Sequence, residues 1–291
     1  FMIQGAQQGI DIVAKMFIDK GDIIITENPT FVGALIAFNP YEPQYVAIPM
    51  DKDGMILDVL EVALQTNPRV KLIYTIPDFQ NPTGISMSLE RRKSLIALAN
   101  QYDVIILEDS PYREIRFEGK SIPSLKSLDI QGRVIQLGTF SKILCPGIRL
   151  GWVIAEKELA EKLSLLNIER QSLTQEGLEA GINEVISNNM LDTDKVLVVY
   201  LPDLHESIAG IVAGRLKEKF NLPTIVLTKA HDGAKGSARS IEGYNIFEEL
   251  VKCKELLGKF GGHPMAAGLS LPTESINEFR TMINHNCTLT E

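Results

Sequence analysis

The stretch VIQLGTFSKILCPGIRLGWVIA carries two isolated cations, Lys142 and Arg149, between two apolar runs. A lysine amine that follows a buried strand can act as a nucleophile and form a Schiff base with a carbonyl carbon. Thr139 and Ser141 come just before Lys142, and hydroxyl groups beside an arginine are suited to bind phosphate. The stretch therefore predicts a reactive amine next to an anion-binding corner.

Polar residues also follow other apolar runs. Asp109 ends the run DVIILED and precedes Tyr112, whereas Asn81 lies in the string NPTG after the run KLIYTI. A carboxylate at the end of a buried strand needs a cationic or hydrogen-bonding partner, and Tyr112 is one candidate for Asp109. Taken alone, the string NPTG is better explained as a turn.

Three further candidates lie near the start of the chain. Ala6 and Gln7 open a predicted helix, and free amides at a helix N-terminus attract phosphate. Phe31 follows a Pro-Thr pair and is either an aromatic platform for a ligand or a core aromatic. Each of these signals is weak alone, so their value depends on whether the fold brings them together.

These residues can meet only if the apolar runs form neighbouring strands of one sheet. Most runs are continuously apolar, which is typical of strands covered on both faces, and amphipathic stretches at 5–21 and 88–103 predict helices between them. This pattern predicts an α/β fold with a mostly parallel sheet, in which ligands bind at the carboxyl ends of the strands. The predicted strands are DIIIT (22–26), YVAIP (45–49), KLIYTI (71–76), DVIILED (103–109), RVIQLGT (133–139) and RLGWVIA (149–155).

Together, the candidates offer a Schiff-base lysine, an acid for a ring nitrogen, phenol and amide donors, and a phosphate cradle. Pyridoxal 5'-phosphate needs this inventory. Residues 1–162 also resemble the large domain of fold-type I, class I/II aminotransferases, in the aromatic, kynurenine or aminoadipate branch. The matching strings are GAQQGID, ENPTFVGAL, DFQNPTG, EDSPYREIRFEG and GTFSKILCPGIRLGW.

The resemblance implies amino-group transfer between an amino acid and a 2-oxo acid, in a homodimer formed by this domain. By the same resemblance, Lys142 holds the cofactor and moves a proton, and Asp109 pairs with the ring nitrogen. Tyr112 and Asn81 contact the ring oxygen, and Phe31 stacks on the ring. The implied phosphate ligands are Ala6, Gln7, Thr139, Ser141 and Arg149. The family's N-terminal segment and small domain, which supplies an arginine for the substrate carboxylate, have no counterpart that matches here, so we expect impaired transamination.

The second part of the chain predicts a connecting helix at 163–190 and a smaller α/β domain at 191–291. Arginine and hydroxyl side chains in the string KGSARS are candidates for phosphate contact, as is the histidine of GKFGGHPM. A solvated loop, a tight turn and a helix cap explain the same strings about equally well. The candidate residues are His205, Ser237, Arg239, Ser240, Gly261, Gly262 and His263.

These strings resemble the C-terminal, DHH-associated domain of RecJ-type single-strand-specific exonucleases. The resemblance covers residues 165–291 and includes LHESIAGIVAGRLKEKFNLPTIVL and LLGKFGGHPMAAGLSL. It implies contact with single-stranded DNA through the Gly-Gly-His loop. The family's metal-bearing domain with its Asp-His-His motif has no counterpart here, so we expect no metal site and no exonuclease activity.

Composition sets outer limits on function. The chain has 291 residues and a formal net charge of −8, and both halves carry more acidic than basic residues, so general adhesion to nucleic acid is not predicted. The three cysteines, Cys145, Cys253 and Cys287, are far apart and predict neither a disulfide framework nor a zinc site, which fits the cytoplasm. Neither a membrane span nor a signal peptide is predicted.

Three hypotheses follow from these patterns. The first is a pyridoxal-phosphate aminotransferase-like enzyme with an appended domain. The second is a single-stranded nucleic-acid-binding module with a passenger α/β domain. The third is a chimera of two partial proteins without an integrated activity, because the change from one resemblance to the other falls inside a predicted helix.

Overall fold

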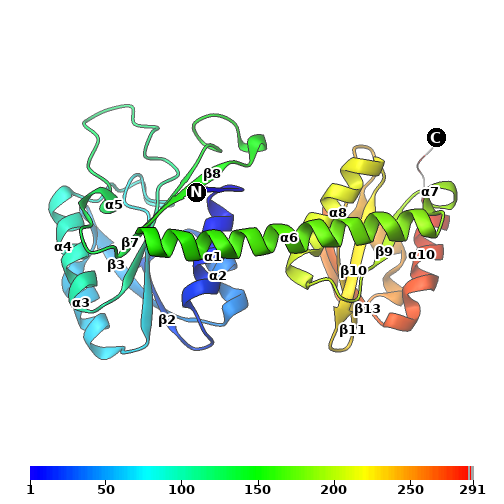
Figure 1. The fold of residues 1–291 in the computed structure, drawn as a ribbon, viewed down its shortest axis with the longest axis horizontal. Helices are drawn as coiled ribbons and strands as arrows, with labels where there is room; N and C mark the ends of the chain where they lie inside the picture. Colours follow the sequence, from blue (N-terminus) through cyan, green and yellow to red (C-terminus); the bar gives the residue numbers. More distant parts are fainter. Residues whose placement is uncertain (288, 290–291) are drawn as a thin grey trace. The chain divides into compact units, whose positions relative to one another are not determined.

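The computed structural model describes residues 1–287 and 289, which form two compact units (Figure 1). Unit 1 comprises Phe1–Ile168 and unit 2 comprises Glu169–Glu291. The division falls inside one long helix, α6 (Lys157–Ser187), which begins six residues before the predicted connecting helix at 163–190 and ends three residues before the predicted end. In the described part of the chain, no helix combines the length and the apolar composition that a bilayer crossing requires.

Unit 1 is built on an eight-stranded sheet with the order β1-β8-β7-β6-β5-β2-β3-β4. The strands β3, β2, β5, β6 and β7 run parallel to one another, whereas β8 pairs with β7 in the antiparallel direction. This topology confirms the predicted α/β class and the mostly parallel sheet. The strands are β1 (Met2–Ile3), β2 (Ile23–Asn28), β3 (Gln44–Asp51), β4 (Gly54–Met55), β5 (Val70–Thr75), β6 (Ile105–Asp109), β7 (Val134–Thr139) and β8 (Gly151–Ile154).

Helices cover both faces of this sheet, as Figure 1 shows. One core contains buried residues of α1, α2 and the start of α6, and the other contains buried residues of α3, α4 and α5. Because both faces are covered, β2, β5, β6 and β7 are almost entirely buried, which explains their continuous apolar runs. The helices are α1 (Ala6–Phe17), α2 (Val32–Phe38), α3 (Leu57–Thr66), α4 (Leu89–Gln101) and α5 (Leu125–Leu128), with 3-10 turns η1 (Asn39–Tyr41) and η2 (Pro146–Ile148).

Unit 2 has a five-stranded sheet with the order β12-β13-β11-β10-β9. Its cores lie on the two faces of the sheet, one with α8 and the end of α6, the other with α9 and α10. The strands are β9 (Leu197–Tyr200), β10 (Thr224–Ala230), β11 (Gly233–Arg239), β12 (Phe260–His263) and β13 (Ala266–Leu271). The helices are α7 (Met190–Thr193), α8 (Glu206–Phe220), α9 (Ile246–Lys252) and α10 (Ile276–His285), with 3-10 turns η3 (Lys254–Leu256) and η4 (Thr273–Ser275).

Candidate functional site

The candidate residues of unit 1 all lie at one edge of its sheet. The parallel strands β2, β5, β6 and β7 end at this edge, and the antiparallel strand β8 begins there, with Thr139 opposite Gly151. The strand β1 is antiparallel to β8 and therefore also ends at this edge, just before α1. Asp109 and Thr139 are the last residues of β6 and β7, and Arg149 precedes β8. The other candidates follow the ends of these strands: Ala6, Gln7, Phe31, Asn81, Tyr112, Ser141 and Lys142.

Asp109 lies at the centre of this edge and is 2% exposed. Its Oδ2 accepts a hydrogen bond of 2.9 Å from the hydroxyl group of Tyr74, whereas its buried Oδ1 has no hydrogen-bond partner. Burial raises the pKa of Asp109 to about 6, and the bond from Tyr74 opposes that shift. Burying an acceptor without a donor costs free energy of folding. A ligand that donates a hydrogen bond to Oδ1 would remove this cost.

The sequence offered Tyr112 as one candidate partner of Asp109, and the structure shows that Tyr74 of β5 is the residue that donates to Asp109. Tyr74 lies inside a buried apolar run, where a phenol hydroxyl needs a hydrogen-bond partner. This need is the sequence feature that could have identified Tyr74. Tyr112 instead accepts a hydrogen bond at its hydroxyl oxygen from Asn81 Nδ2, at 3.3 Å. Both Tyr112 and Asn81 are half-buried, and Lys142 is exposed.

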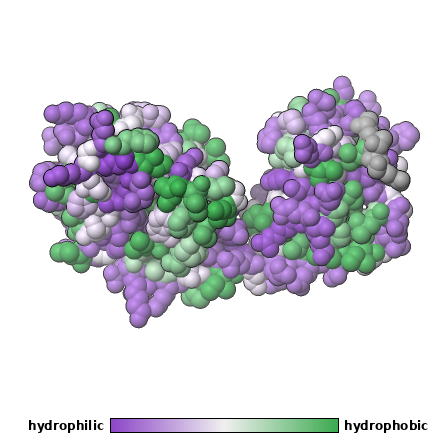
Figure 2. Space-filling model, turned by 90° about the horizontal axis from the view of Figure 1, so that it is seen from above, coloured by the Kyte–Doolittle hydropathy of each residue, from purple (hydrophilic) through white to green (hydrophobic). Residues whose placement is uncertain are grey.

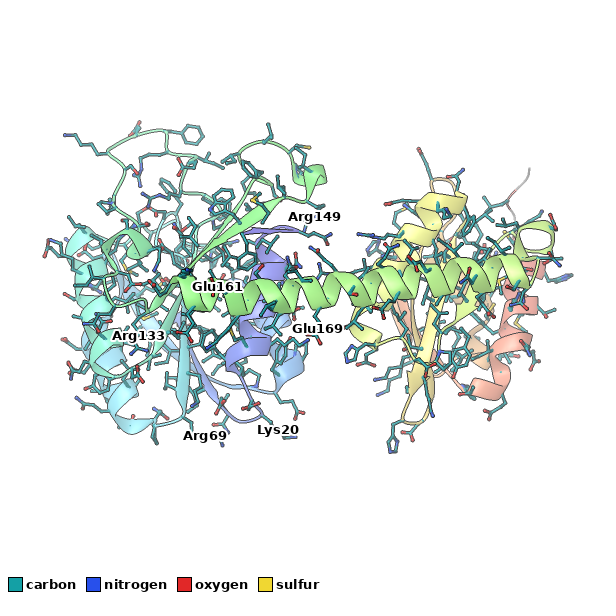
Figure 3. The ribbon with its side chains drawn as sticks, viewed as in Figure 1. Lys20, Arg69, Arg133, Arg149, Glu161 and Glu169 are labelled. Atoms are coloured by element: carbon teal, nitrogen blue, oxygen red, sulfur yellow. The ribbon has the colours of Figure 1, made fainter. Side chains whose placement is uncertain are left out.

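The start of α1 and the strands β7 and β8 meet at a corner where their backbones lie close together. A Cβ atom on Gly151 would lie 3.0 Å from the Cα of Gly5 and 2.6 Å from the oxygen of Gly138, so only glycine permits this approach. A Cβ on Gly5 would lie 3.2 Å from Nη2 of Arg149, and Figure 3 shows Arg149 beside the start of the chain. The contact places the guanidinium group at the N-terminus of the 12-residue helix α1, which has no side-chain cap.

Two hydroxyl groups and one amide lie next to this corner. The Oγ1 atom of Thr139 lies 3.1 Å from Oγ of Ser141 and accepts a hydrogen bond of 3.2 Å from the backbone amide of Ser141. Gln7 donates from Nε2 to the backbone oxygen of Gly33 at 2.6 Å. The ring of Phe31 lies over Gly33, since a Cβ there would be 2.4 Å from the ring. Phe31 is therefore close to Gln7 and packs at the margin of the core.

Glu27 is a second buried carboxyl group at this edge, and the sequence analysis did not single it out. It is 1% exposed, and its Oε1 accepts from the hydroxyl of Thr75 at 2.5 Å. Its Oε2 accepts from Gln80 Nε2 at 3.0 Å and from the amide of Ile76 at 3.3 Å. Burial raises the pKa of Glu27 to about 7, the hydrogen bonds from Thr75 and Gln80 oppose that shift, and the charge of Asp109 adds to it.

Glu27 makes stability depend on pH with a defined sign. Its pKa in the folded chain is about 7, against an ordinary value of 4.5, so the folded state binds the proton more tightly than the unfolded state. The stabilisation is complete below pH 4.5 and is lost as pH rises through about 7. Between these limits we expect wild type to lose ~3 kcal/mol more of its unfolding free energy than Glu27→Gln.

Urea unfolding from pH 4.5 to 7.5 checks this expectation for wild type and Glu27→Gln. The amide can keep all three interactions, because its oxygen can face Gln80 and Ile76 and its nitrogen can donate to Thr75. Asp109 is present in both proteins, so the difference between the two curves reports the titration of Glu27 together with its coupling to Asp109. Parallel curves would contradict the expectation.

In unit 2, three strands bring four candidate residues into two rows. Arg239 in β11 lies opposite Ala266 in β13, which lies opposite His263 in β12. Residues directly opposite each other in antiparallel strands point to the same face, so Arg239 and His263 share one face of the sheet. The next row is Ser237, Gly268 and Gly261.

The sheet face that carries Arg239 and His263 is covered by α8 at β11 and is open at β12. A Cβ on Gly210 of α8 would lie 2.7 Å from Nη2 of Arg239 and 3.3 Å from Oγ of Ser237, so α8 packs directly over β11. A Cβ on Gly261 would meet nothing within 4 Å. Gly261, Gly262 and His263 are all exposed. Burial lowers the pKa of Arg239.

The structure places the other two candidates of unit 2 in structural contacts. Ser240 is 1% exposed and donates from its hydroxyl group to the backbone oxygen of Tyr244. His205 caps helix α8, because its Nδ1 accepts a hydrogen bond of 3.3 Å from the amide of Ser207. Neither residue is brought to the open rows of β12 and β13.

Comparison with known proteins finds the predicted aminotransferase family and the predicted DHH-associated domain. Residues 1–196 match aminotransferase class I and II, and residues 193–288 match the DHHA1 domain. Aromatic-amino-acid aminotransferase 1 of Thermococcus litoralis is 51% identical over 165 residues, which cover 55% of this chain and 40% of that protein. The 2-aminoadipate transaminase of Thermus thermophilus is 38% identical over 162 residues, covering 55% of this chain and 41% of that protein.

Solved structures of aminotransferases are also similar to this chain. A Pyrococcus horikoshii kynurenine aminotransferase, in complex with PMP, has a TM-score of 0.56 and 27% identity, over 99% of this chain and 76% of that chain. The aminotransferase Aro8 of Candida albicans has a TM-score of 0.54 and 35% identity, over 56% of this chain and 39% of that chain.

The chain spans about half or less of the length of the curated relatives it matches. The expected cofactor, pyridoxal phosphate, is confirmed as the cofactor of the family. The match to the aminotransferases covers residues 1–196, well over half of the 291 residues, and the chain therefore belongs to the class I and II aminotransferase family.

Proposed function

We propose that unit 1 binds pyridoxal 5'-phosphate and carries the chemistry of amino-group transfer between an amino acid and a 2-oxo acid. The observation that carries this proposal is the unpartnered Oδ1 of buried Asp109, at the sheet edge that also presents Lys142. A protonated pyridine nitrogen supplies the donor that Oδ1 lacks. We place the phosphate group at the corner formed by Arg149 and the start of α1, because a guanidinium group and free helix amides both attract an anion.

Each residue of the edge then has one task. Asp109 accepts the ring N–H at Oδ1, while Tyr74 fixes its other oxygen. When the cofactor is bound, Phe31 would cover its ring, and Tyr112 and Asn81 would donate to its ring oxygen. Its phosphate group would be held by Ala6, Gln7, Thr139, Ser141 and Arg149. When bound, the cofactor supplies an electron sink for the carbon that loses its proton.

Lys142 carries out the proton transfer. With the cofactor bound, Nζ of Lys142 would be the amine that holds it covalently, and the free amine would accept the proton from the substrate Cα and donate it back. Lys142 is exposed, so a substrate amine can reach it from solvent. We propose that the transfer is impaired, because the family resemblance gives no counterpart in this chain to the arginine that holds the substrate carboxylate.

Spectroscopy of the purified chain with added pyridoxal phosphate tests the proposal. We expect a yellow protein with an absorbance band that survives gel filtration. Borohydride reduction followed by peptide mapping is expected to place a pyridoxyl group on Lys142. A colourless protein that takes up no cofactor would overturn the proposed function.

We further propose that unit 1 pairs with a second copy of itself. Apolar side chains near Lys142 are exposed to solvent, and Figure 2 shows apolar patches on the surface of unit 1. Covering such side chains is favourable, and they lie beside the proposed site, so a partner would also close that site. The residues are Ile143, Leu144, Ile148 and Leu150. Sedimentation that shows a monomer, with and without cofactor, would exclude the pair.

A second candidate function belongs to unit 2. We propose that the open face beside Arg239 and His263 binds the phosphates of single-stranded DNA, as the RecJ-type resemblance implies. The supporting observation is the bare glycine surface of β12, where a Cβ on Gly261 would meet nothing within 4 Å. Backbone can approach a ligand closely there, with Arg239 and His263 alongside in one row.

His263→Ala and Arg239→Ala are each expected to weaken single-strand binding and to lower the salt slope by about 1, because each removes one phosphate contact. Fluorescence anisotropy with a labelled oligonucleotide at several salt concentrations measures both quantities. Lys254→Ala is the control, since Lys254 is exposed and follows α9 on the other side of the sheet. Equal affinity of all four proteins would contradict the proposal.

We also propose that the two units derive from two separate parent proteins. The supporting observations are the matches to two different families and their overlap at residues 193–196, at the end of α7. Sequencing genomic DNA across the codons for residues 155–200 tests this origin. Two separate reading frames in place of one would show that the fusion is not natural.

A further inference from the structure

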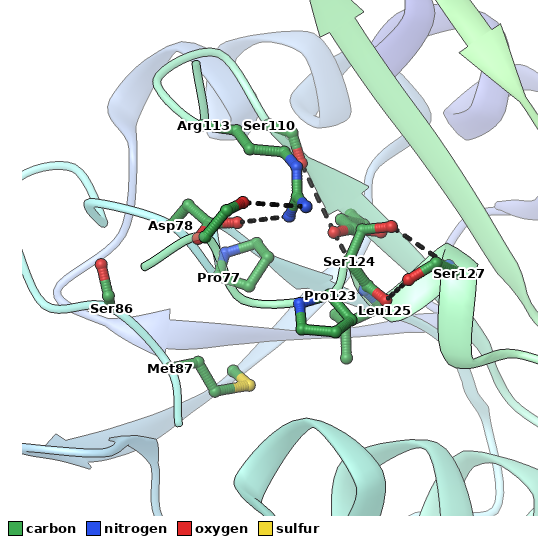
Figure 4. Close-up of polar contacts among 12 residues, drawn as sticks. Pro77, Asp78, Ser86, Met87, Ser110, Arg113, Pro123, Ser124, Leu125 and Ser127 are labelled. Atoms are coloured by element: carbon green, nitrogen blue, oxygen red, sulfur yellow. Dashed lines mark hydrogen bonds and ion pairs between the residues drawn. The ribbon is translucent and has the colours of Figure 1, made fainter. Parts of the chain in front are cut away.

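A buried aspartate outside the proposed site is surrounded by three arginines. Asp78 has a side chain that is 1% exposed, and it accepts from fully buried Arg92 at 2.9 Å and 3.1 Å. Arg113 Nη1 lies 3.2 Å from its Oδ2, and Arg116 Nη2 lies 3.4 Å from its Oδ1. Figure 4 shows Arg113 facing Asp78 across the ends of two strands.

Charge balance alone does not explain this arrangement. Arg92 already neutralises Asp78, and its other donors reach the backbone oxygens of Pro77, Met87 and Pro123. Arg113 and Arg116 are therefore not needed to offset the buried charge. Both come from the segment after β6, whereas Asp78 belongs to the loop after β5. Their effect is to hold these two segments together.

The same two segments carry two residues of the proposed site. Asp78 precedes Asn81 by three residues, and Arg113 directly follows Tyr112. The bond from Asn81 Nδ2 to Tyr112 Oη is 3.3 Å long, near the limit for such a bond, so its geometry depends on how the loops are held. Arg116 adds a second tie, since its guanidinium carbon lies 4.7 Å from the ring centre of Phe79.

We propose that Arg113 is a positioning residue that, through Asp78, aligns Tyr112 and Asn81 toward one ligand oxygen. This inference rests on the proposed function for the identity of that oxygen, the ring oxygen of the cofactor. Two aligned donors stabilise the anionic form of an oxygen, so their alignment controls the pH at which the bound cofactor changes its absorbance.

The first test uses the full chain without cofactor. We expect Arg113→Gln to speed hydrogen exchange of the amides at 79–87 and 110–115 by about fivefold, as expected for the loss of a partly buried ion pair. Arg113→Lys should give a smaller increase, because an ammonium group keeps the charge but lacks the planar fork. Asp78 stays paired with Arg92 in both variants, so both should fold.

Arg91→Gln is the matched control. Arg91 pairs with Asp51 at 2.8 Å, and its side chain is 18% exposed, against 20% for Arg113. Its partners lie on β3 and β4 rather than on the two loops. Unchanged exchange in Arg113→Gln, or the same increase in Arg91→Gln, would overturn the inference.

The second test titrates the absorbance of the chain with bound pyridoxal phosphate. We expect the midpoint to rise in Arg113→Gln, to rise less in Arg113→Lys and to stay unchanged in Arg91→Gln. A wild-type midpoint in Arg113→Gln would overturn the alignment even if the exchange rates change. If wild type takes up no cofactor, the proposed function fails, and the exchange rates alone decide whether Arg113 joins the two loops.

Discussion

Lys142→Ala is expected to abolish covalent capture of pyridoxal phosphate. The substitution removes the only atom of this residue that can bond to the cofactor carbonyl, and it also removes the base that moves the proton. The absorbance band of the linked cofactor and the borohydride-trapped peptide should both disappear. Any amino-transfer activity should fall by roughly 10²- to 10⁴-fold, the range that a positioned acid–base group contributes.

Two further variants distinguish the loss of the nucleophilic amine from the loss of a positive charge. Lys142→Arg keeps a cation at the site but has no nucleophilic amine, so it should behave like Lys142→Ala. Lys93→Ala removes an exposed lysine of α4 that pairs with Glu90, and it should keep the band at full strength. A pyridoxyl group trapped on another lysine in Lys142→Ala would show that Lys142 is not the amine that binds the cofactor.

Asp78→Asn is expected to lower the free energy of unfolding by roughly 3–5 kcal/mol, the cost of breaking a buried ion pair from one side. Arg92 is fully buried and would keep its charge in a place without a counterion. Its neighbours Arg113 and Arg116 would then add repulsion instead of sharing a carboxylate. Urea unfolding at constant pH measures the loss.

The matched control is Asp51→Asn. Asp51 also pairs with an arginine, Arg91, but its side chain is 40% exposed, so water can solvate the arginine that remains. We expect a much smaller loss of stability in this variant. The double variant Asp78→Asn/Arg92→Met should regain part of the loss, because it removes the buried charge itself. Equal losses in Asp78→Asn and Asp51→Asn would refute the explanation from burial.

The sequence predicted the sheet of unit 1 well because its strands are buried on both faces. Runs such as KLIYTI and DVIILED are then apolar throughout, and the helices between them force parallel neighbours. The strand β4 was not predicted, since it is only two residues long and pairs at the margin of the sheet. Such short strands carry no periodic signal.

The sequence predicted which residues share the edge, but not all of their contacts. Strand ends fix the positions of Asp109 and Asn81, and these could be predicted without side-chain geometry. The pairing of Tyr74 with Asp109 depends on β5 and β6 being neighbours in register, with Tyr74 opposite Leu107. The contacts of Asp78 with Arg92 and Arg113 join segments that are distant in sequence and show no local pattern.

The three arginines around Asp78 also limit the order in which this protein can change over generations. Arg113 and Arg116 can be replaced one at a time, because the pair of Asp78 and Arg92 stays balanced without them. Asp78 and Arg92 cannot be replaced separately without passing through an intermediate with a lone buried charge. Sequence drift at this place should therefore begin at the two outer arginines and reach the inner pair only by coupled substitutions.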